Sequence, residues 1–296
     1  MILLFVAQRW GAMMRKTVRL SGLLSVLGLC IASGLANAES SKVIATGGAS
    51  TIEGSAGGGI VPWAVINGYG SSGEWSATAM TSGVYVDDFT LKVIGASVSY
   101  DNRYEFSVAR QTFDLDTIGG ELGQDIIGFK YKIAGELLYT AMPQISLGLQ
   151  YKTVDDFALP QAVGAQDDAG LDIYLAASKV FFDVAFGRNV LLNGTVRATK
   201  ANQTGLLGFG SANDDDYHYE LEGSAAVLLA DNLALGIEYR QKPNQLGFAR
   251  EDDWQDIFVA WFVNKHISVV AAYTDLGSIA GLDTQQGWYI SVEAAL

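Results

Sequence analysis

Charged side chains recur in segments of this sequence where apolar and polar residues alternate, and they fall on the polar positions. The basic ones come first and the acidic ones later: Lys92, Lys130, Lys132, Lys152 and Arg197, then Glu220, Glu222, Glu238, Asp256 and Glu293. If these segments are strands of one closed barrel, one arc of its inner wall is basic and the facing arc is acidic. Opposed charges across a narrow tube of low dielectric constant create a transverse field, which orders water and favours small polar or zwitterionic solutes. We therefore predict that these residues line a pore.

The division of charge is incomplete, because Glu105, Asp172 and Arg240 depart from it. The alternative is that the charged residues pair across a closed interior and fill it. That arrangement would give a structural or surface-interaction barrel with an occluded lumen. A barrel of about twelve strands or more is wide enough to conduct, whereas a smaller one is filled by its own side chains.

Three short spacings resemble the motifs of outer-membrane hydrolases. His266–Ser268 has the His-x-Ser spacing of outer-membrane phospholipases, but no asparagine follows at a suitable distance. Asp114–Asp116 and Asp216–His218 resemble the acidic and Asp–His pairs of outer-membrane aspartyl proteases, in which such a pair could activate water. Two-residue spacings arise by chance in a chain with 32 acidic residues. A loop-end hydrolase of aspartyl-protease type is therefore the third hypothesis, and we expect no enzyme, no metal site and no cofactor.

The elements that must position the charged residues are β-strands. In segment 144–152, Ile145, Leu147, Leu149 and Tyr151 alternate with polar residues or glycine. The same period of two recurs in segments 127–133, 190–197, 217–225 and 233–240. This period places apolar side chains on one face of a strand and polar side chains on the other. The sequence therefore predicts an all-β fold.

The joints between these strands are alternately short and long. Tight turns are predicted at 101–102, 141–143, 187–189, 231–232 and 264–266, and longer segments at 113–124, 153–169, 200–216, 241–253 and 274–286. The longer segments carry clusters of acid, such as Asp214–Asp216 and Glu251–Asp253. Short periplasmic turns and longer extracellular loops are typical of outer-membrane barrels.

A soluble β-sandwich would also alternate, but two features favour a barrel in a membrane. Aromatic residues recur near strand ends, as in the belts at membrane interfaces: Tyr100, Tyr104, Tyr139, Tyr151, Tyr239, Tyr273 and Trp288. The chain also ends on an alternating strand, with Trp288, Ile290, Val292, Ala294 and Leu296 on one face. We expect that strand to be recognised by the barrel-assembly machinery, and the outer face to contact outer-membrane lipid and lipopolysaccharide.

The first 38 residues have the organisation of a secretory signal peptide. A basic start at Met14–Lys16 precedes the apolar stretch Leu20–Leu35 and the small-x-small cleavage site Ala36–Ala38. Residues 1–13 lie upstream of a second possible start at Met14 and could be a mis-assigned start. The only cysteine, Cys30, lies inside this signal, so no disulfide is expected in the exported chain.

Residues 39–60 form a glycine-rich segment, which we predict to be either a plug in the lumen or a first strand, ahead of a barrel formed by 61–296. Thirteen candidate strands follow from Val61, and a bacterial single-chain barrel has an even number. Either residues 41–53 supply a fourteenth strand, or 61–69 does not span and the number is twelve. The fold is thus predicted to be a closed antiparallel transmembrane barrel of 12 or 14 strands.

Several motifs resemble a proteobacterial family of outer-membrane β-barrel proteins known only as a domain of unknown function. They are Ala45–Gly48, Gly57–Ala64, Ala109–Gln111, Ala201–Gly210 and Gly287–Tyr289. The resemblance spans nearly all of the exported chain. It implies the barrel and the outer membrane of the cell, and it implies no activity.

The charge of the chain is consistent with an exported surface. The formal net charge is −13, and four of the 19 basic residues but none of the 32 acidic residues precede residue 39. Nucleic acid is excluded as a partner, because its phosphates need a basic surface. The first functional hypothesis is passive or weakly selective passage of small polar solutes; the residues do not name the solute or the oligomeric state.

Overall fold

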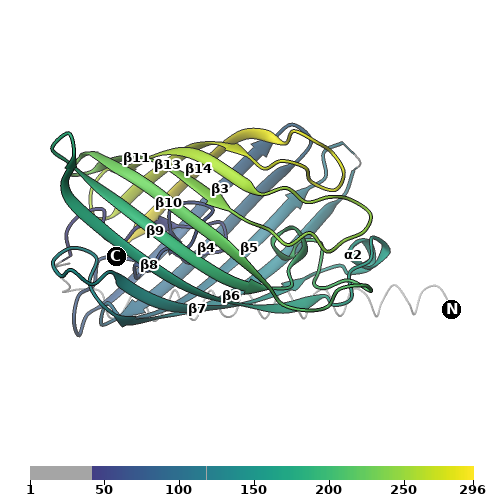
Figure 1. Cartoon of the computed structure of the whole chain (residues 1–296), viewed down its shortest axis with the longest axis horizontal. Coiled ribbons are helices and arrows are strands. Elements are labelled where there is room, and N and C mark those ends of the chain that lie inside the picture. Colours follow the sequence, from purple (N-terminus) through teal and green to yellow (C-terminus); the bar gives the residue numbers. More distant parts are fainter. Residues whose placement is uncertain (1–41, 118) are drawn as a thin grey trace. The chain divides into compact units, whose positions relative to one another are not determined.

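A computed structural model describes residues 42–117 and 119–296; the predicted signal peptide, residues 1–38, lies outside the described residues. The wall consists of β3 Trp75–Val86, β4 Thr90–Tyr100, β5 Tyr104–Asp114, β6 Glu121–Ala134, β7 Gln144–Val154, β8 Ala169–Ala185, β9 Arg188–Thr199, β10 His218–Ala230, β11 Leu233–Arg240, β12 Trp254–Phe262, β13 Ile267–Asp275 and β14 Gln286–Ala295. Each strand pairs antiparallel with its neighbours in sequence, and β14 pairs with β3 to close the barrel. Figure 1 shows the barrel from the side, with its strands tilted along the wall.

Of the two strand numbers left open by the sequence, twelve is right. The wall begins at Trp75 and not at Val61, which corrects the predicted barrel boundary. Residues 61–74 contain Pro62, which cannot donate to a sheet, and a turn-rich stretch that ends in Gly73 at φ +75°. These residues continue the glycine-rich segment instead of pairing with the wall.

Short turns and long loops alternate between the two ends of the barrel, as the sequence predicts. One end carries the short turns and the C-terminus, and we call it the short-turn end. The other end carries the longer loops, including α2 Ala158–Ala162 and η1 Asn202–Gly205. No helix in the described part of the chain is long and apolar enough to cross a membrane.

The outer face of the wall carries an apolar band. Exposed side chains on the strands include Ile94, Phe106, Ile127, Leu221, Ile237, Ile257, Trp261 and Ile290. Aromatic pairs stand near both ends, with ring centroids 4.8 Å apart for Trp75 and Tyr100 and 5.4 Å apart for Tyr273 and Trp288. A closed barrel with an apolar outer band between aromatic belts is built to span a bilayer, and the protein is an outer-membrane barrel.

The lumen is filled by residues 42–74, which we call the inner segment. Nearly all of residues 47–70 are buried, and the short strands β1 Ala49–Ser50 and β2 Ala56–Gly57 form a small hairpin there. Both ends of the segment lie at the short-turn end: Lys42 lies near Asn102 and Tyr139, and Gly73 donates its N–H to Asp101. The segment therefore enters and leaves the barrel through the same mouth.

A second stretch enters the lumen from the opposite side. Residues 201–211, which we call the inward loop, are buried although they connect β9 to β10 at the long-loop end. Gln203 and Thr204 adopt positive φ values of 44° and 58°, a region that non-glycine residues seldom occupy. The barrel is thus closed from both ends, by the inner segment and by the inward loop.

Candidate functional site

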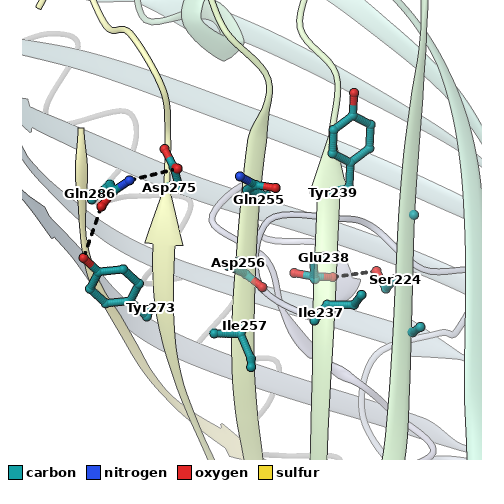
Figure 2. A pocket seen from close by; sticks show the side chains of 12 residues that line it. Ser224, Ile237, Glu238, Tyr239, Gln255, Asp256, Ile257, Tyr273, Asp275 and Gln286 are labelled. Carbon is teal, nitrogen blue, oxygen red and sulfur yellow. Dashed lines mark hydrogen bonds between the residues drawn. The ribbon is translucent and has the colours of Figure 1, made fainter. Parts of the chain in front are cut away.

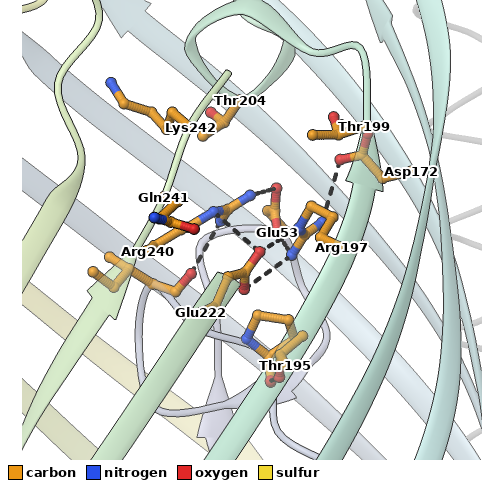
Figure 3. Close-up of polar contacts among 12 residues, drawn as sticks. Glu53, Asp172, Thr195, Arg197, Thr199, Thr204, Glu222, Arg240, Gln241 and Lys242 are labelled. Carbon is orange, nitrogen blue, oxygen red and sulfur yellow. Dashed lines mark hydrogen bonds and ion pairs between the residues drawn. The ribbon is translucent and has the colours of Figure 1, made fainter. Parts of the chain in front are cut away.

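The centre of the lumen holds a cluster of ion pairs built around Glu53 of the inner segment (Figure 3). Its carboxylate lies 2.8 Å from Arg240 Nη2 on β11, 3.2 Å from Arg197 Nη2 on β9 and 2.5 Å from Lys152 Nζ on β7. All four side chains are buried. A buried charge of either sign is costly unless it is paired and hydrogen-bonded, so Glu53 and its three partners depend on one another.

Two wall carboxylates complete this cluster. Asp172 lies 2.7 Å from Lys152 Nζ and 3.2 Å from Arg197 Nη1, and Glu222 pairs with both Arg197 and Arg240. Three acids thus face three bases, which we call the central cluster: Glu53, Asp172, Glu222, Lys152, Arg197 and Arg240. Its formal charge is balanced, which removes most of the field that three like charges would create.

The central cluster also joins the two closing elements. Lys152 donates to the backbone carbonyl of Thr204 at 3.0 Å as well as to Glu53. The inward loop and the inner segment therefore meet on one ammonium group. Movement of either element would leave that charge with fewer partners.

A second buried pair fastens the inner segment to the neighbouring strands β5 and β6. Lys130 on β6 donates to the carbonyls of Ala56 and Val65 at 2.9 and 3.1 Å. Glu105 on β5 accepts from the N–H groups of Ala56 and Asn67 at 3.0 and 2.8 Å. The two charged groups lie 3.5 Å apart. Both side chains thus satisfy backbone groups of a segment with little regular structure of its own.

Glu238 and Asp256 lie side by side on β11 and β12, directly opposite each other in register (Figure 2). Glu238 accepts from Ile60 N at 2.8 Å and from Ser224 Oγ at 2.7 Å. Neither oxygen of Asp256 has a hydrogen-bond partner within the described part of the chain. Glu238 therefore holds the inner segment, whereas Asp256 makes no side-chain hydrogen bond with that segment and is buried beside a second carboxyl group.

Three further predicted residues lie on the inner face outside these groups. Glu293 on β14 accepts from the hydroxyl of Ser50 in the inner segment. Lys132 lies 3.2 Å from Glu136 near the short-turn end. Glu220 is half-buried, two residues closer than Glu222 to the long loops. The predicted acidic patch of Glu220, Glu222 and Glu238 is thus divided, because Glu222 belongs to the central cluster and Glu238 binds the inner segment.

The prediction that Lys92 lines the lumen is wrong. Its side chain is 62% exposed and pairs with Asp114 at 2.7 Å on the outer face. The neighbours Leu91 and Val93 are buried on the lumen side. Because β4 has apolar residues on both faces, its polar positions do not identify the inner face. The error comes from assuming that every apolar residue faces lipid.

The predicted field between a basic arc and an acidic arc is also wrong for this arrangement. Arg240 and Asp172, which depart from the predicted division, are members of the central cluster, and Glu105 pairs with Lys130. The charges pair across the interior in this structure, as the alternative of an occluded lumen expects.

The sequence did not identify Glu53 as a site residue, because it is an acid in a glycine-rich stretch. Its only signal was a charge in a segment otherwise free of charge from Ala45 to Gly73.

The inward loop is held in the mouth by a buried pair from the β11–β12 loop. Lys242 Nζ lies 3.8 Å from Glu251, and Glu251 accepts the N–H of Gln203 at 3.0 Å. Lys242 also donates to the side-chain oxygen of Gln203 at 2.9 Å. Burial raises the pKa of Glu251 and lowers the pKa of Lys242. The pair therefore binds Gln203, one of the two residues of the inward loop that adopt a positive φ.

The hydrolase spacings do not assemble into the expected pairs. His218 bonds Asp214 at 3.1 Å and not Asp216, and Asp214 also accepts the N–H of Asp216 at 3.3 Å. Asp114 pairs with Lys92, and Asp116 accepts from Thr90. His266 bonds the carbonyl of Ala295 in a short turn. Among the described residues, no group of three or more metal-binding side chains is placed to hold a metal ion.

Comparison with known proteins gives one family and several barrels. A family model described as "Protein of unknown function (DUF3034)" matches residues 46–293. Among solved structures, the NanC porin is 12% identical with a TM-score of 0.47, and the KdgM porin is 10% identical with a TM-score of 0.46; each match covers 73% of this chain and 98% of the porin. Omp33 of Acinetobacter baumannii is 10% identical with a TM-score of 0.45, covering 76% of this chain and all of that one. No function follows from likenesses at this level. The comparison with curated proteins found no match.

Proposed function

Because the chain belongs to the DUF3034 family, whose description carries no activity, we propose from the geometry of the lumen that the protein is a gated outer-membrane channel. The inner segment is the gate, and the barrel with this segment in its lumen is the closed state. The observation that carries the proposal is the polar character of the wall beneath the segment. Its buried inward side chains include Thr78, Ser97, Ser99, Ser107, Gln111, Gln144, Ser146, Ser178, Asn193, Thr195 and Ser224.

Beside apolar contacts, many hydrogen bonds bind the inner segment to this wall. Gln144 and Ser146 donate to the carbonyl of Ala64, Gln111 donates to Ile52 O, and Thr195 donates to Pro62 O. Such a bond exchanges for bonds to water at a net cost of only about 0.5–1.5 kcal/mol. A wall that stays polar beneath its plug can be wetted when the plug leaves, whereas an apolar wall would resist wetting. These contacts therefore support a removable segment.

The path of the segment supports the same proposal. Both of its ends lie at the short-turn end, so it can leave through one mouth without being pulled through the wall. Passage also needs the inward loop to move from the other mouth. An open lumen lined by hydroxyl and amide groups would pass small polar solutes. When Glu53 leaves with the inner segment, the wall keeps three bases and two acids of the central cluster, a small excess of positive charge that favours only weak selection by charge.

Single-channel recording in planar bilayers tests the gate. Replacing Glu53 by Gln removes the charge that Lys152, Arg197 and Arg240 share, so the open probability should rise at least tenfold. Glu136→Gln is the matched control, because it neutralises an exposed acid at the short-turn end that contacts no part of the central cluster. Deletion of residues 42–58 removes Glu53 and half of the inner segment, so it should raise the open probability at least as much, with closed intervals that residues 59–74 and the inward loop still cause.

A tether gives the reverse test. A Cβ added at Gly54, which has a φ of +85°, would lie 3.0 Å from Cβ of Ala109 on β5, so the segment must shift by about 0.5 Å to reach disulfide spacing. The double variant Gly54→Cys/Ala109→Cys should be silent when oxidised and should conduct after reduction. If the Glu53→Gln variant, the deletion variant and the reduced double variant all fold and all stay silent, the channel proposal is wrong.

The alternative is a structural or surface-interaction barrel whose lumen never opens. The near-complete burial of residues 47–70 favours it. That barrel would keep its outer-face contacts with lipid and lipopolysaccharide, and β14 would remain the strand presented to the assembly machinery. This alternative predicts that no folded variant gives single-channel currents in the bilayer.

A further inference from the structure

The lumen changes character at the short-turn end, where the inward side chains become apolar. They include Leu191, Ala226, Ala234, Phe258, Ala260 and Phe262. The outward side chains of the same strands are apolar as well, for example Leu192, Leu235 and Trp261. The outward side chains are apolar because they face lipid. The inward set needs another explanation, because these side chains do not face lipid and they surround an open space.

These inward residues line a cavity of about 290 Å³. Trp63 of the inner segment belongs to its lining and is buried, whereas Val43, Tyr139 and Phe182 at its rim are 50%, 81% and 49% exposed. The cavity is therefore a pocket that opens at the short-turn end and is closed at depth by the inner segment. It is separate from the central cluster, which lies farther toward the long loops.

The chemistry of the pocket limits what it can hold. Besides the hydroxyl of Tyr139 at the rim and the indole N–H of Trp63, which donates to Ser224 and Glu238, polar side chains line the pocket at Thr46, Asn189 and Asp231 among the described residues. The Thr46 hydroxyl donates to Val43 O, and the side-chain oxygen of Asn189 accepts from Asp183 N. No basic side chain lines the pocket in the part of the chain described, and Asp231 would repel an anion. A sugar, a phosphate or a carboxylate would thus lose its water without finding partners.

Apolar surface that faces water is unfavourable, and an apolar ligand that displaces this water is favoured. An apolar protein cavity of about 150 Å³ is large enough for benzene. The pocket is about twice that size, and five of its lining residues are aromatic: Trp63, Tyr139, Phe182, Phe258 and Phe262. We propose that the pocket binds a neutral aromatic molecule of one or two rings. This inference goes beyond the proposed function, because binding does not require the lumen to open.

Binding of radiolabelled naphthalene by the folded protein in detergent tests this inference. Ala226 faces the pocket and Ala225, its neighbour on β10, faces outward. Ala226→Phe should fill the pocket and lower binding at least tenfold, whereas Ala225→Phe should bind one equivalent, like the unaltered protein. The detergent takes up naphthalene equally in all three samples, so their difference isolates the pocket. Equal uptake by all three would overturn the proposal.

A second measurement covers the case in which Ala226→Phe does not fold. Xenon enters dry apolar cavities of this size. Crystals of the unaltered protein under xenon pressure should show the gas between Trp63, Phe258 and Leu191, and naphthalene soaked into them should replace it. Ordered water in that place, with no xenon and no naphthalene, would contradict an apolar ligand site.

Discussion

At the scale of single residues, the contribution of an ion pair to stability depends on whether it is buried or exposed. Arg197 is buried and contacts three carboxylates, Glu53, Asp172 and Glu222. Lys92 lies on the outer face beside Asp114 and is largely exposed. Removing one partner of a buried network leaves uncompensated charge, whereas an exposed pair contributes little to stability.

Replacing Arg197 by Met should therefore lower the free energy of unfolding by about 3–5 kcal/mol, because three buried acids lose a partner. Lys92→Met should leave the unfolding midpoint unchanged. The measurement is the urea dependence of the folded band, which migrates faster than the unfolded chain on unheated gels. Equal midpoints for the two variants would mean that the central cluster is hydrated and does not hold the inner segment.

Gly58 shows how closely the inner segment approaches the wall. A Cβ added there would lie 2.2 Å from Oε1 of Glu238. Gly58→Ala should cost about 1–3 kcal/mol, as overpacking does, and it should also loosen the segment. Gly194 on β9 is the control, because an added Cβ meets nothing within 4 Å. The melting temperatures of both variants, measured by thermal unfolding, give the comparison. A Gly58→Ala variant that melts at the same temperature as the unaltered protein would show that the segment has room to shift.

At the scale of elements, the inner segment is tied to the wall at its exit as well as at its centre. Asp101, in the turn after β4, accepts from Gly73 N at 2.7 Å and from the Ser72 hydroxyl at 3.1 Å. These hydrogen bonds lower the pKa of Asp101 below its ordinary value of 3.8. The turn therefore fastens the last residues before β3 to the short-turn end.

A contact that lowers the pKa of a carboxyl group contributes fully to stability at pH values above the ordinary pKa. That contribution is lost as the pH falls through the lowered pKa. The Gly73–Asp101 contact should thus hold at neutral pH and weaken only below pH 3.8. The carboxyl carbon of Asp101 and the Gly73 amide should titrate together in NMR spectra. In Asp101→Asn the Gly73 amide should be independent of pH; a midpoint above 3.8 in the unaltered protein would contradict the contact.

The strands of the wall could be predicted from sequence because the alternation that indicates them involves residues close together in the chain. Alternation of period two indicated the strands. The predicted turns at 101–102 and 231–232 lie in the short turns observed, and the one at 187–189 overlaps the turn 186–187. The lumen face was harder to identify. Strands such as β4 and β12 are apolar on both faces, so the periodicity does not say which face Lys92 or Phe258 occupies.

The filling of the lumen could not be predicted in the same way. Residues 42–74 have almost no regular secondary structure, and their positions are set by single contacts to distant wall residues, such as Ala64 with Ser178 and Ile60 with Glu238. Such contacts join residues more than 100 positions apart. The inward loop is a similar case, because its acidic neighbours predicted an exposed loop while residues 201–211 are buried.

At the scale of the whole molecule, the two ends of the barrel differ in length and charge of their connections. The long-loop end carries Asp214–Asp216 and Glu251–Asp253, whereas the turn between β10 and β11 is only Asp231–Asn232. In outer-membrane barrels the longer connections are extracellular. The short-turn end, with the exits of the inner segment and the apolar pocket, then faces the periplasm.

A protease site inserted after Asp214, beyond the buried part of the inward loop, should be cut on intact cells. The same site inserted after Asn232 should be cut only when the outer membrane is opened. Immunoblots of treated cells give the result, and the folded band on unheated gels shows that each insertion is tolerated. Cleavage at Asn232 alone would mean that the short-turn end faces the cell exterior.

The shared mouth of the inner segment also bears on how the barrel is made. β3 directly follows the segment, and it pairs with β14, the last strand of the chain. The ring therefore cannot close until synthesis is complete. A segment that had to cross the ring would need to be in place before that closure. This one begins and ends at the same side, so a finished, empty ring can receive it afterwards, and closure of the ring and occupation of its interior become separable steps of biogenesis.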